Sequence, residues 1–96
     1  MIARVWRGVA ADPAGAQAYL RHLDGNVLPA LKLIAGYREV RVLRRNQEFL
    51  VVTFWDSMEA IRRFAGADPE RAVVEPEARA VLKEYDDVVR HFEVER

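Results

Sequence analysis

The stretch EFLVVTFWD, residues 48–56, decides the fold of this chain. Its side chains fall into two alternating sets: Phe49, Val51, Thr53 and Trp55 on one side, and Leu50, Val52 and Phe54 on the other. Such β-branched and aromatic residues favour a strand, and successive residues of a strand point to opposite faces of its sheet. Because both sets are largely apolar, the sequence predicts that both faces of this strand are covered.

The segments before this strand have strand and helix patterns in turn. A strand is expected over residues 1–9. A helix is expected over residues 11–31, where Asp12 can cap the first turn. Gly25 and Pro29 interrupt the helical pattern, so we expect a kink or a break near them.

The rest of the chain is expected to add a hairpin, a second helix and a closing strand. The hairpin covers residues 34–56 and turns at 45–47. A helix follows it, and the helical pattern restarts at Asp68 and again at Pro76. The stretch VVRHFEV, residues 88–94, has the alternation of a last strand.

This order of elements predicts an α+β ferredoxin-like βαββαβ sandwich, with an antiparallel four-stranded sheet and helices on one face. The first strand would be central, with the last strand as its neighbour. The other face of the sheet would then expose apolar side chains, which favours association. We therefore expect a homodimer in which two sheets pack face to face.

Length and composition indicate a single globular domain over residues 1–96. The chain has no cysteine, which excludes disulfides and thiolate metal sites. No apolar run approaches the roughly 20 residues that span a bilayer, and the first residues lack the apolar core of a signal peptide. We expect a cytoplasmic protein with no membrane partner.

The charges argue against a nucleic-acid partner, because the net charge is zero. The sequence also lacks the glycine motifs that bind phosphates and the HExxH zinc motif. The two histidines, His22 and His91, are too few and too far apart in sequence to indicate a metal site, so no metal is expected. Glu75 and Glu77 flank Pro76, where acidic residues favour the dipole at a helix start.

His91 is the first candidate for chemistry. Glu93 shares its face of the predicted strand, and a neighbouring carboxylate can fix a histidine tautomer or favour its protonated form. Arg7 lies near the end of the adjacent first strand, so a base, a carboxylate and a cation would meet at one end of the sheet. The alternative is that His91 is a polar residue of the sheet surface with no chemical role.

The chain also resembles a known family. MIARVWRG (1–8), VTFWDSMEAIRRFAG (52–66), AVVEPEAR (72–79) and VRHFEV (89–94) resemble the antibiotic biosynthesis monooxygenase family. The resemblance implies a dimeric α/β barrel with a ligand pocket between each sheet and its helices. It also implies oxidation of polyketide quinols or anthrones by oxygen, with no cofactor, although other members degrade haem.

Within that family, an acidic phenol becomes electron-rich enough to reduce oxygen once it is deprotonated. The protein must supply a base, an anion-stabilising group and a dry apolar pocket. We assign His91 as base and Arg7 as anion stabiliser. The remaining candidates are substrate-binding residues: Tyr37, Trp55 and Phe64 as walls, and Glu93 beside the histidine. If Glu93 keeps His91 protonated, the histidine would bind an anionic substrate instead.

The haem-degrading members carry an asparagine on the first strand, a tryptophan on the second helix and a histidine beyond it. Those positions fall on Arg7, Phe64 and Val74, and none matches. Haem degradation is therefore not expected, while haem binding through His91 or His22 stays open. Two further alternatives are a non-catalytic protein that binds a small ligand and a structural dimerisation module. A void of a few hundred cubic ångströms would exclude the module.

Overall fold

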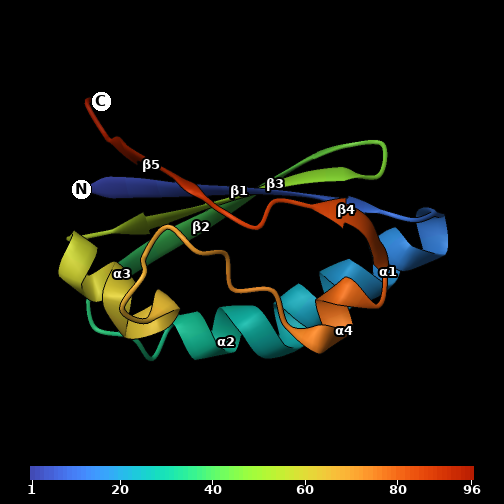
Figure 1. Cartoon of the computed structure of the whole chain (residues 1–96), viewed down its shortest axis with the longest axis horizontal. Coiled ribbons are helices and arrows are strands. Elements are labelled where there is room, and N and C mark those ends of the chain that lie inside the picture. Colours follow the sequence, from blue (N-terminus) through green and yellow to red (C-terminus); the bar gives the residue numbers. More distant parts are fainter.

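A computed structural model describes the whole chain, residues 1–96, as one antiparallel sheet with its helices on a single face (Figure 1). The elements in chain order are β1 (Ile2–Ala10), α1 (Pro13–His22), the π-helical turn η1 (Leu23–Val27), α2 (Leu28–Leu31), β2 (Tyr37–Arg45), β3 (Glu48–Trp55), α3 (Met58–Ala65), α4 (Pro76–Arg79), β4 (Leu82–Tyr85) and β5 (Arg90–Glu93). The strands run in the order β2–β3–β1, and both β4 and β5 pair with the other edge of β1. This confirms the α+β ferredoxin-like fold.

The register of the sheet fixes which side chains face the helices. Arg4 lies opposite Thr53 of β3 and His91 of β5, so these three residues share one face. Phe49, Thr53 and Trp55 are buried on the helix side, as the alternation in β3 predicts. The odd-numbered residues of β1, such as Arg7, face the opposite side.

Two groups of buried side chains form the core under the helices. One surrounds Phe49 and Tyr19, and the other surrounds Trp55 and Ile61. Buried aromatic residues carry much of the apolar area in a domain of this size. The indole N–H of Trp55 has a hydrogen-bond partner inside the core, because it donates to the Thr53 hydroxyl at 2.8 Å.

The helix ends follow from local sequence. Asp12 accepts a hydrogen bond from the backbone nitrogen of Gly15 at 2.7 Å, which caps α1 as expected. Ser57 caps α3 in the same way, and Gly66 ends it with a φ of 88°. Near Gly25 the helix does not break, because the π-helical turn η1 joins α1 to α2.

The last third of the chain differs from the sequence prediction. The helix expected from Asp68 is absent, and only Pro76–Arg79 is helical. Instead, residues 67–75 form an extended segment along the edge of the sheet, interrupted by a turn at Pro69–Glu70 and held by backbone bonds such as Val89 N to Glu70 O. An additional strand, β4, forms where helix was expected, and the closing strand expected over residues 88–94 is shortened to β5.

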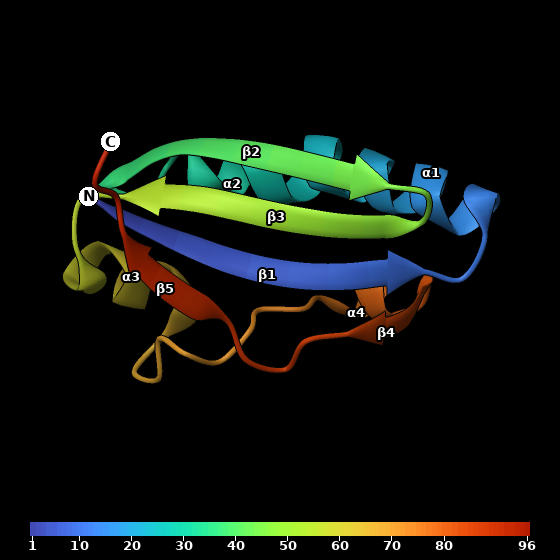
Figure 2. The same ribbon diagram turned by 90° about the horizontal axis from the view of Figure 1, so that it is seen from above.

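The other face of the sheet is bare, with the strands in front of the helices in Figure 2. Leu50, Val52 and Phe54 of β3 are only partly buried there. Leu43 and Phe92 on the same face have exposed fractions of 53% and 51%. No helix of the chain is long and apolar enough to cross a membrane.

Candidate functional site

A small apolar cavity lies between the sheet and the helices. Its volume is about 100 Å³, and one water occupies roughly 30 Å³ of liquid. A volume of a few hundred cubic ångströms would have excluded a purely structural module, and this cavity is smaller. A binding experiment is therefore needed to decide between a structural module and a ligand-binding protein. The apolar walls come from β1, β3, the helices and the extended segment, and they include Trp6, Tyr19, Leu23, Val51, Phe64 and Val74.

The cation that lines this cavity is Arg4, which the sequence analysis did not single out. Only 3% of Arg4 is exposed, and no carboxylate pairs with it. Its guanidinium donates to the backbone oxygens of Pro69 and, at 2.8 Å, Arg71. The guanidinium also lies 5.8 Å from the centre of the Phe64 ring. Arg4 therefore holds the extended segment and presents a positive charge to an apolar space.

Burial lowers the pKa of Arg4 to about 10. The guanidinium is still a cation at neutral pH, because its pKa lies well above 7. A buried charge without a counter-charge is unfavourable, and two backbone carbonyls offset only part of that cost. An anion in the cavity would supply the missing partner.

His91 reaches this arginine but does not line the cavity. Its Nε2 lies 3.2 Å from Nη1 of Arg4. The pKa of His91 is lowered by burial first and by the Arg4 cation second, while Glu70 opposes the shift. The imidazole is therefore neutral at neutral pH, and Nε2 accepts from Arg4 while Nδ1 carries the proton.

Glu93 is not placed to keep His91 protonated. The two residues share a face, because Glu93 lies opposite Ile2 and His91 lies opposite Arg4. However, Glu93 is exposed and forms no ion pair with the histidine. The cation beside His91 opposes protonation, and no carboxylate of β5 counters it.

Arg7 lies on the opposite face of the sheet, so the expected meeting of Arg7 and His91 does not occur. Its guanidinium pairs with Glu48 at 2.5 Å and with Glu84 at 3.2 Å. The hydrogen bonds to these carboxylates raise the pKa of Arg7. Strand alternation explains the difference, because residues 4 and 7 point to different sides of β1.

The three aromatic residues predicted as walls form one chain of rings, but only Phe64 lines the cavity. The Phe64 ring stacks on Trp55 at 5.8 Å between centres, and Tyr37 meets the other side of Trp55 edge-on at 5.5 Å. Trp55 is fully buried in the core. Burial raises the pKa of Tyr37, with a smaller contribution from Glu39.

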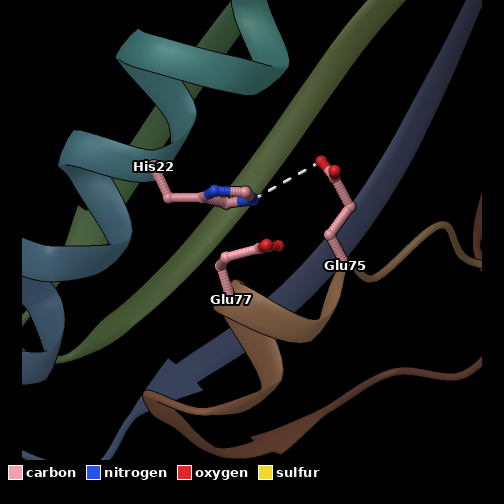
Figure 3. A group of neighbouring side chains, drawn as sticks. All are labelled: His22, Glu75 and Glu77. Carbon is pink, nitrogen blue, oxygen red and sulfur yellow. Dashed lines mark ion pairs between the residues drawn. The ribbon is translucent and has the colours of Figure 1, made fainter.

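His22 is the histidine that lines the cavity (Figure 3). It is 8% exposed at the end of α1, and its Nε2 lies 3.5 Å from a carboxylate oxygen of Glu75. Its Nδ1 lies 3.1 Å from the side-chain nitrogen of Asn26. The sequence carried a signal for this placement, because His22 follows buried Tyr19 at helical spacing.

A family model for antibiotic biosynthesis monooxygenases matches residues 4–76, from Arg4 to the first residue of α4. The chain belongs to the antibiotic biosynthesis monooxygenase family. No curated protein sequence matches it. The expected family is therefore confirmed, whereas the substrate is not identified by a relative.

Solved structures support the same fold. A monooxygenase from Streptomyces coelicolor, bound to nanaomycin D, has a TM-score of 0.58 and 20% identity, and the match covers 71% of this chain and 62% of that one. A cofactor-independent oxygenase from Streptomyces nogalater has a TM-score of 0.67 and 14% identity, covering 99% and 93%. A haem degrader from Mycobacterium tuberculosis with two haems bound has a TM-score of 0.61 and 20% identity, covering 100% and 97%.

The structure also shows where the three positions of the haem comparison lie relative to the cavity. The sequence placed Arg7 where haem-degrading members have asparagine on the first strand. Arg7 faces away from the cavity, and Arg4 and Trp6 are the residues of β1 that line it. At the other two positions, Phe64 and Val74 do line the cavity.

Proposed function

We propose that this protein is a cofactor-independent monooxygenase that oxidises a small, acidic, quinol-like aromatic compound in the cavity between sheet and helices. The observation that carries the proposal is the buried cation of Arg4, which has no carboxylate partner and lines an apolar cavity. Family membership supports an oxygenase role. A phenolate fits both features, because it combines an apolar ring with one negative oxygen.

The reaction requires the substrate to lose its phenolic proton first. Arg4 stabilises the phenolate and so lowers the pKa of the bound phenol. His91 is the proposed proton acceptor, acting from behind Arg4 through one water. When the phenolate takes the hydrogen bond of Arg4, Nε2 of the neutral imidazole is released to take up the proton. The half-buried position of His91 lets it pass the proton to water.

The phenolate then supplies the electrons that reduce oxygen. A ring C–H group ortho to the phenolate oxygen, which a one-ring quinol retains, becomes a carbonyl. One atom of O₂ enters the product and the other leaves as water, so the substrate provides all four electrons. The apolar walls exclude bulk water from the electron-rich ring.

Cavity size favours a substrate with one ring. Pockets for drug-sized ligands have volumes of about 300–1,000 Å³, whereas this one measures about 100 Å³. A polycyclic quinol or a haem would have to displace the extended segment that Arg4 holds. We therefore favour a one-ring quinol over a polycyclic polyketide, and we do not favour haem as the ligand.

Oxygen uptake with a panel of one-ring phenols and quinols tests the proposal. Wild-type protein should consume one O₂ per product above the spontaneous rate. His91→Gln should keep binding and lose most of the turnover, and Arg4→Met should lose both. Binding without uptake by the wild type would indicate a non-catalytic ligand-binding protein. Neither binding nor uptake would favour a structural module.

We also propose that the protein is a homodimer formed by the bare faces of two sheets. Leu50, Val52 and Phe54 lie there beside the exposed side chains of Leu43 and Phe92. Exposed apolar side chains of this kind favour burial against a second copy. Light scattering should give a dimer for the wild type and a monomer for Leu50→Glu. A monomeric wild type would contradict the proposal.

A further inference from the structure

We propose that His22, Glu75 and Glu77 bind a divalent transition-metal ion, of the zinc type, at the edge of the cavity. The proposal goes beyond the oxygenase function and does not depend on it. His22 comes from the end of α1, while the two glutamates flank the start of α4 (Figure 3). One ligand atom from each residue lies within 4.8 Å of the others.

The distances suit a tetrahedral ion. Two ligand atoms that each lie about 2.1 Å from a tetrahedral zinc are about 3.4 Å apart. The separation between His22 Nε2 and the Glu75 oxygen is 3.5 Å. Glu77 is exposed, so its carboxylate is free to move the remaining distance.

The histidine is held in one orientation, as metal ligands usually are. The ring is buried in the core, and Asn26 contacts its Nδ1 at 3.1 Å. An outer partner of this kind fixes the ring and selects the nitrogen that binds the metal. Coordination by Nε2 requires the proton on Nδ1. After a turn of the amide group, this N–H can donate a hydrogen bond to the amide oxygen of the exposed Asn26.

The charges around the histidine also favour a cation. Figure 3 shows both carboxylates directed toward the imidazole ring. Neither glutamate forms an ion pair with an arginine or a lysine. Two adjacent carboxylates repel each other, and a divalent ion would neutralise both.

A metal ion bound at this site would lie at the edge of the cavity and could contact a ligand there. His22 and Glu75 both line the cavity, so a fourth coordination position would open toward a ligand inside it. Three protein ligands and one open position are typical of zinc sites that accept water or substrate. A bound ion would also join α1 to α4 across the edge of the cavity.

Calorimetric titration of tag-free, chelator-treated protein with zinc chloride tests the site. Wild-type protein should bind one ion per chain and gain thermal stability on binding. Loss of an outer-shell partner typically weakens binding by about 10–100-fold, so removing a ligand should weaken it at least tenfold. Glu77→Gln should therefore show at least that loss, and the double variant Glu75→Gln/Glu77→Gln should show no binding.

Matched controls make the result specific. Glu77 is exposed, so its substitution does not threaten folding, whereas His22 is buried and its variants are secondary evidence. Glu95→Gln removes another exposed carboxylate, and His91→Gln removes the other histidine; both should bind zinc like the wild type. The proposal is overturned if the wild type does not bind at millimolar zinc, or if Glu77→Gln binds unchanged. Oxygen uptake is a separate measurement, so either proposal can fail alone.

Discussion

Arg4 and Arg7 lie three residues apart on β1, yet their charges have opposite surroundings. Arg4 faces the helices, has no carboxylate partner and has its pKa lowered by burial to about 10. Arg7 faces the bare side of the sheet, and two carboxylates raise its pKa. The same residue type is thus destabilised as a cation on one face and stabilised on the other.

The difference identifies which arginine is available to a ligand. The charge of Arg7 is already compensated by Glu48 and Glu84, so an anion would have to compete with two carboxylates. Arg4 donates only to backbone carbonyls and His91. A buried cation with neutral partners gains most from an incoming anion, because little water competes for it.

Arg4→Met should have the largest effect. Two carbonyl groups of the extended segment lose a charged donor, and a hydrogen bond to a charged group contributes about 1.5–3 kcal/mol. Removing a buried charge that lacks a counter-charge offsets part of this loss. We therefore expect the free energy of unfolding to fall by about 2–4 kcal/mol, measured by urea denaturation. Binding of a one-ring phenolate should fall about 100-fold or more, because hydrogen-bonded charge pairs are the strong ones.

Arg7→Met is the matched control on the other face. The phenolate affinity should stay at the wild-type value, since Arg7 does not line the cavity. Equal losses of affinity in the two variants would contradict the assignment of Arg4 as the anion site. A loss of phenolate affinity in Arg7→Met alone would support Arg7 as the anion stabiliser, as the sequence analysis predicted.

Gly8→Ala tests the packing on the face of the sheet that the helices cover, and we expect an effect of intermediate size on stability. A Cβ atom at Gly8 would lie 2.4 Å from the ring of Trp6, which covers this glycine and forms part of the cavity wall. Overpacking of this kind typically costs about 1–3 kcal/mol. Denaturation should show that loss, and Trp6 fluorescence should change because the ring must move.

Gly25→Ala is the corresponding control, because a Cβ atom there meets nothing within 4 Å. Alanine at a helical position should leave stability unchanged or raise it by up to about 1 kcal/mol. If both glycine variants lose the same stability, close contact between Gly8 and Trp6 is not the cause of the loss.

The sequence predicted the fold well, because alternation and capping are local signals. The two sets of side chains in β3, the Asp12 cap and the hairpin turn all follow from neighbouring residues. The formation of β4 within the expected helical region does not. The segment before them depends on Arg4, whose guanidinium binds carbonyls more than sixty residues away.

The candidate site was harder to predict, because it depends on which strands lie opposite one another. His91 pairs with Arg4 only through the register of β1 and β5. The sequence-based assignment of Arg7 did not use the strand register. Strand alternation alone places Arg7 on the opposite face of β1 from Arg4. His22 and Glu75 meet because α1 and the start of α4 are adjacent in space, which no short sequence motif encodes.

His91→Gln should have the smallest effect on stability, and the effect should appear only in acid. The pKa of His91 in the folded protein lies below its ordinary value of about 6.5. As the pH falls below about 6.5, the unfolded chain therefore takes up this proton first, and the folded state loses stability. Glutamine keeps an acceptor for Arg4 but cannot be protonated. The decline in urea midpoint from pH 7 to pH 5 should be shallower in the variant, and equal slopes would show that neither burial nor Arg4 opposes protonation of His91 in the folded protein.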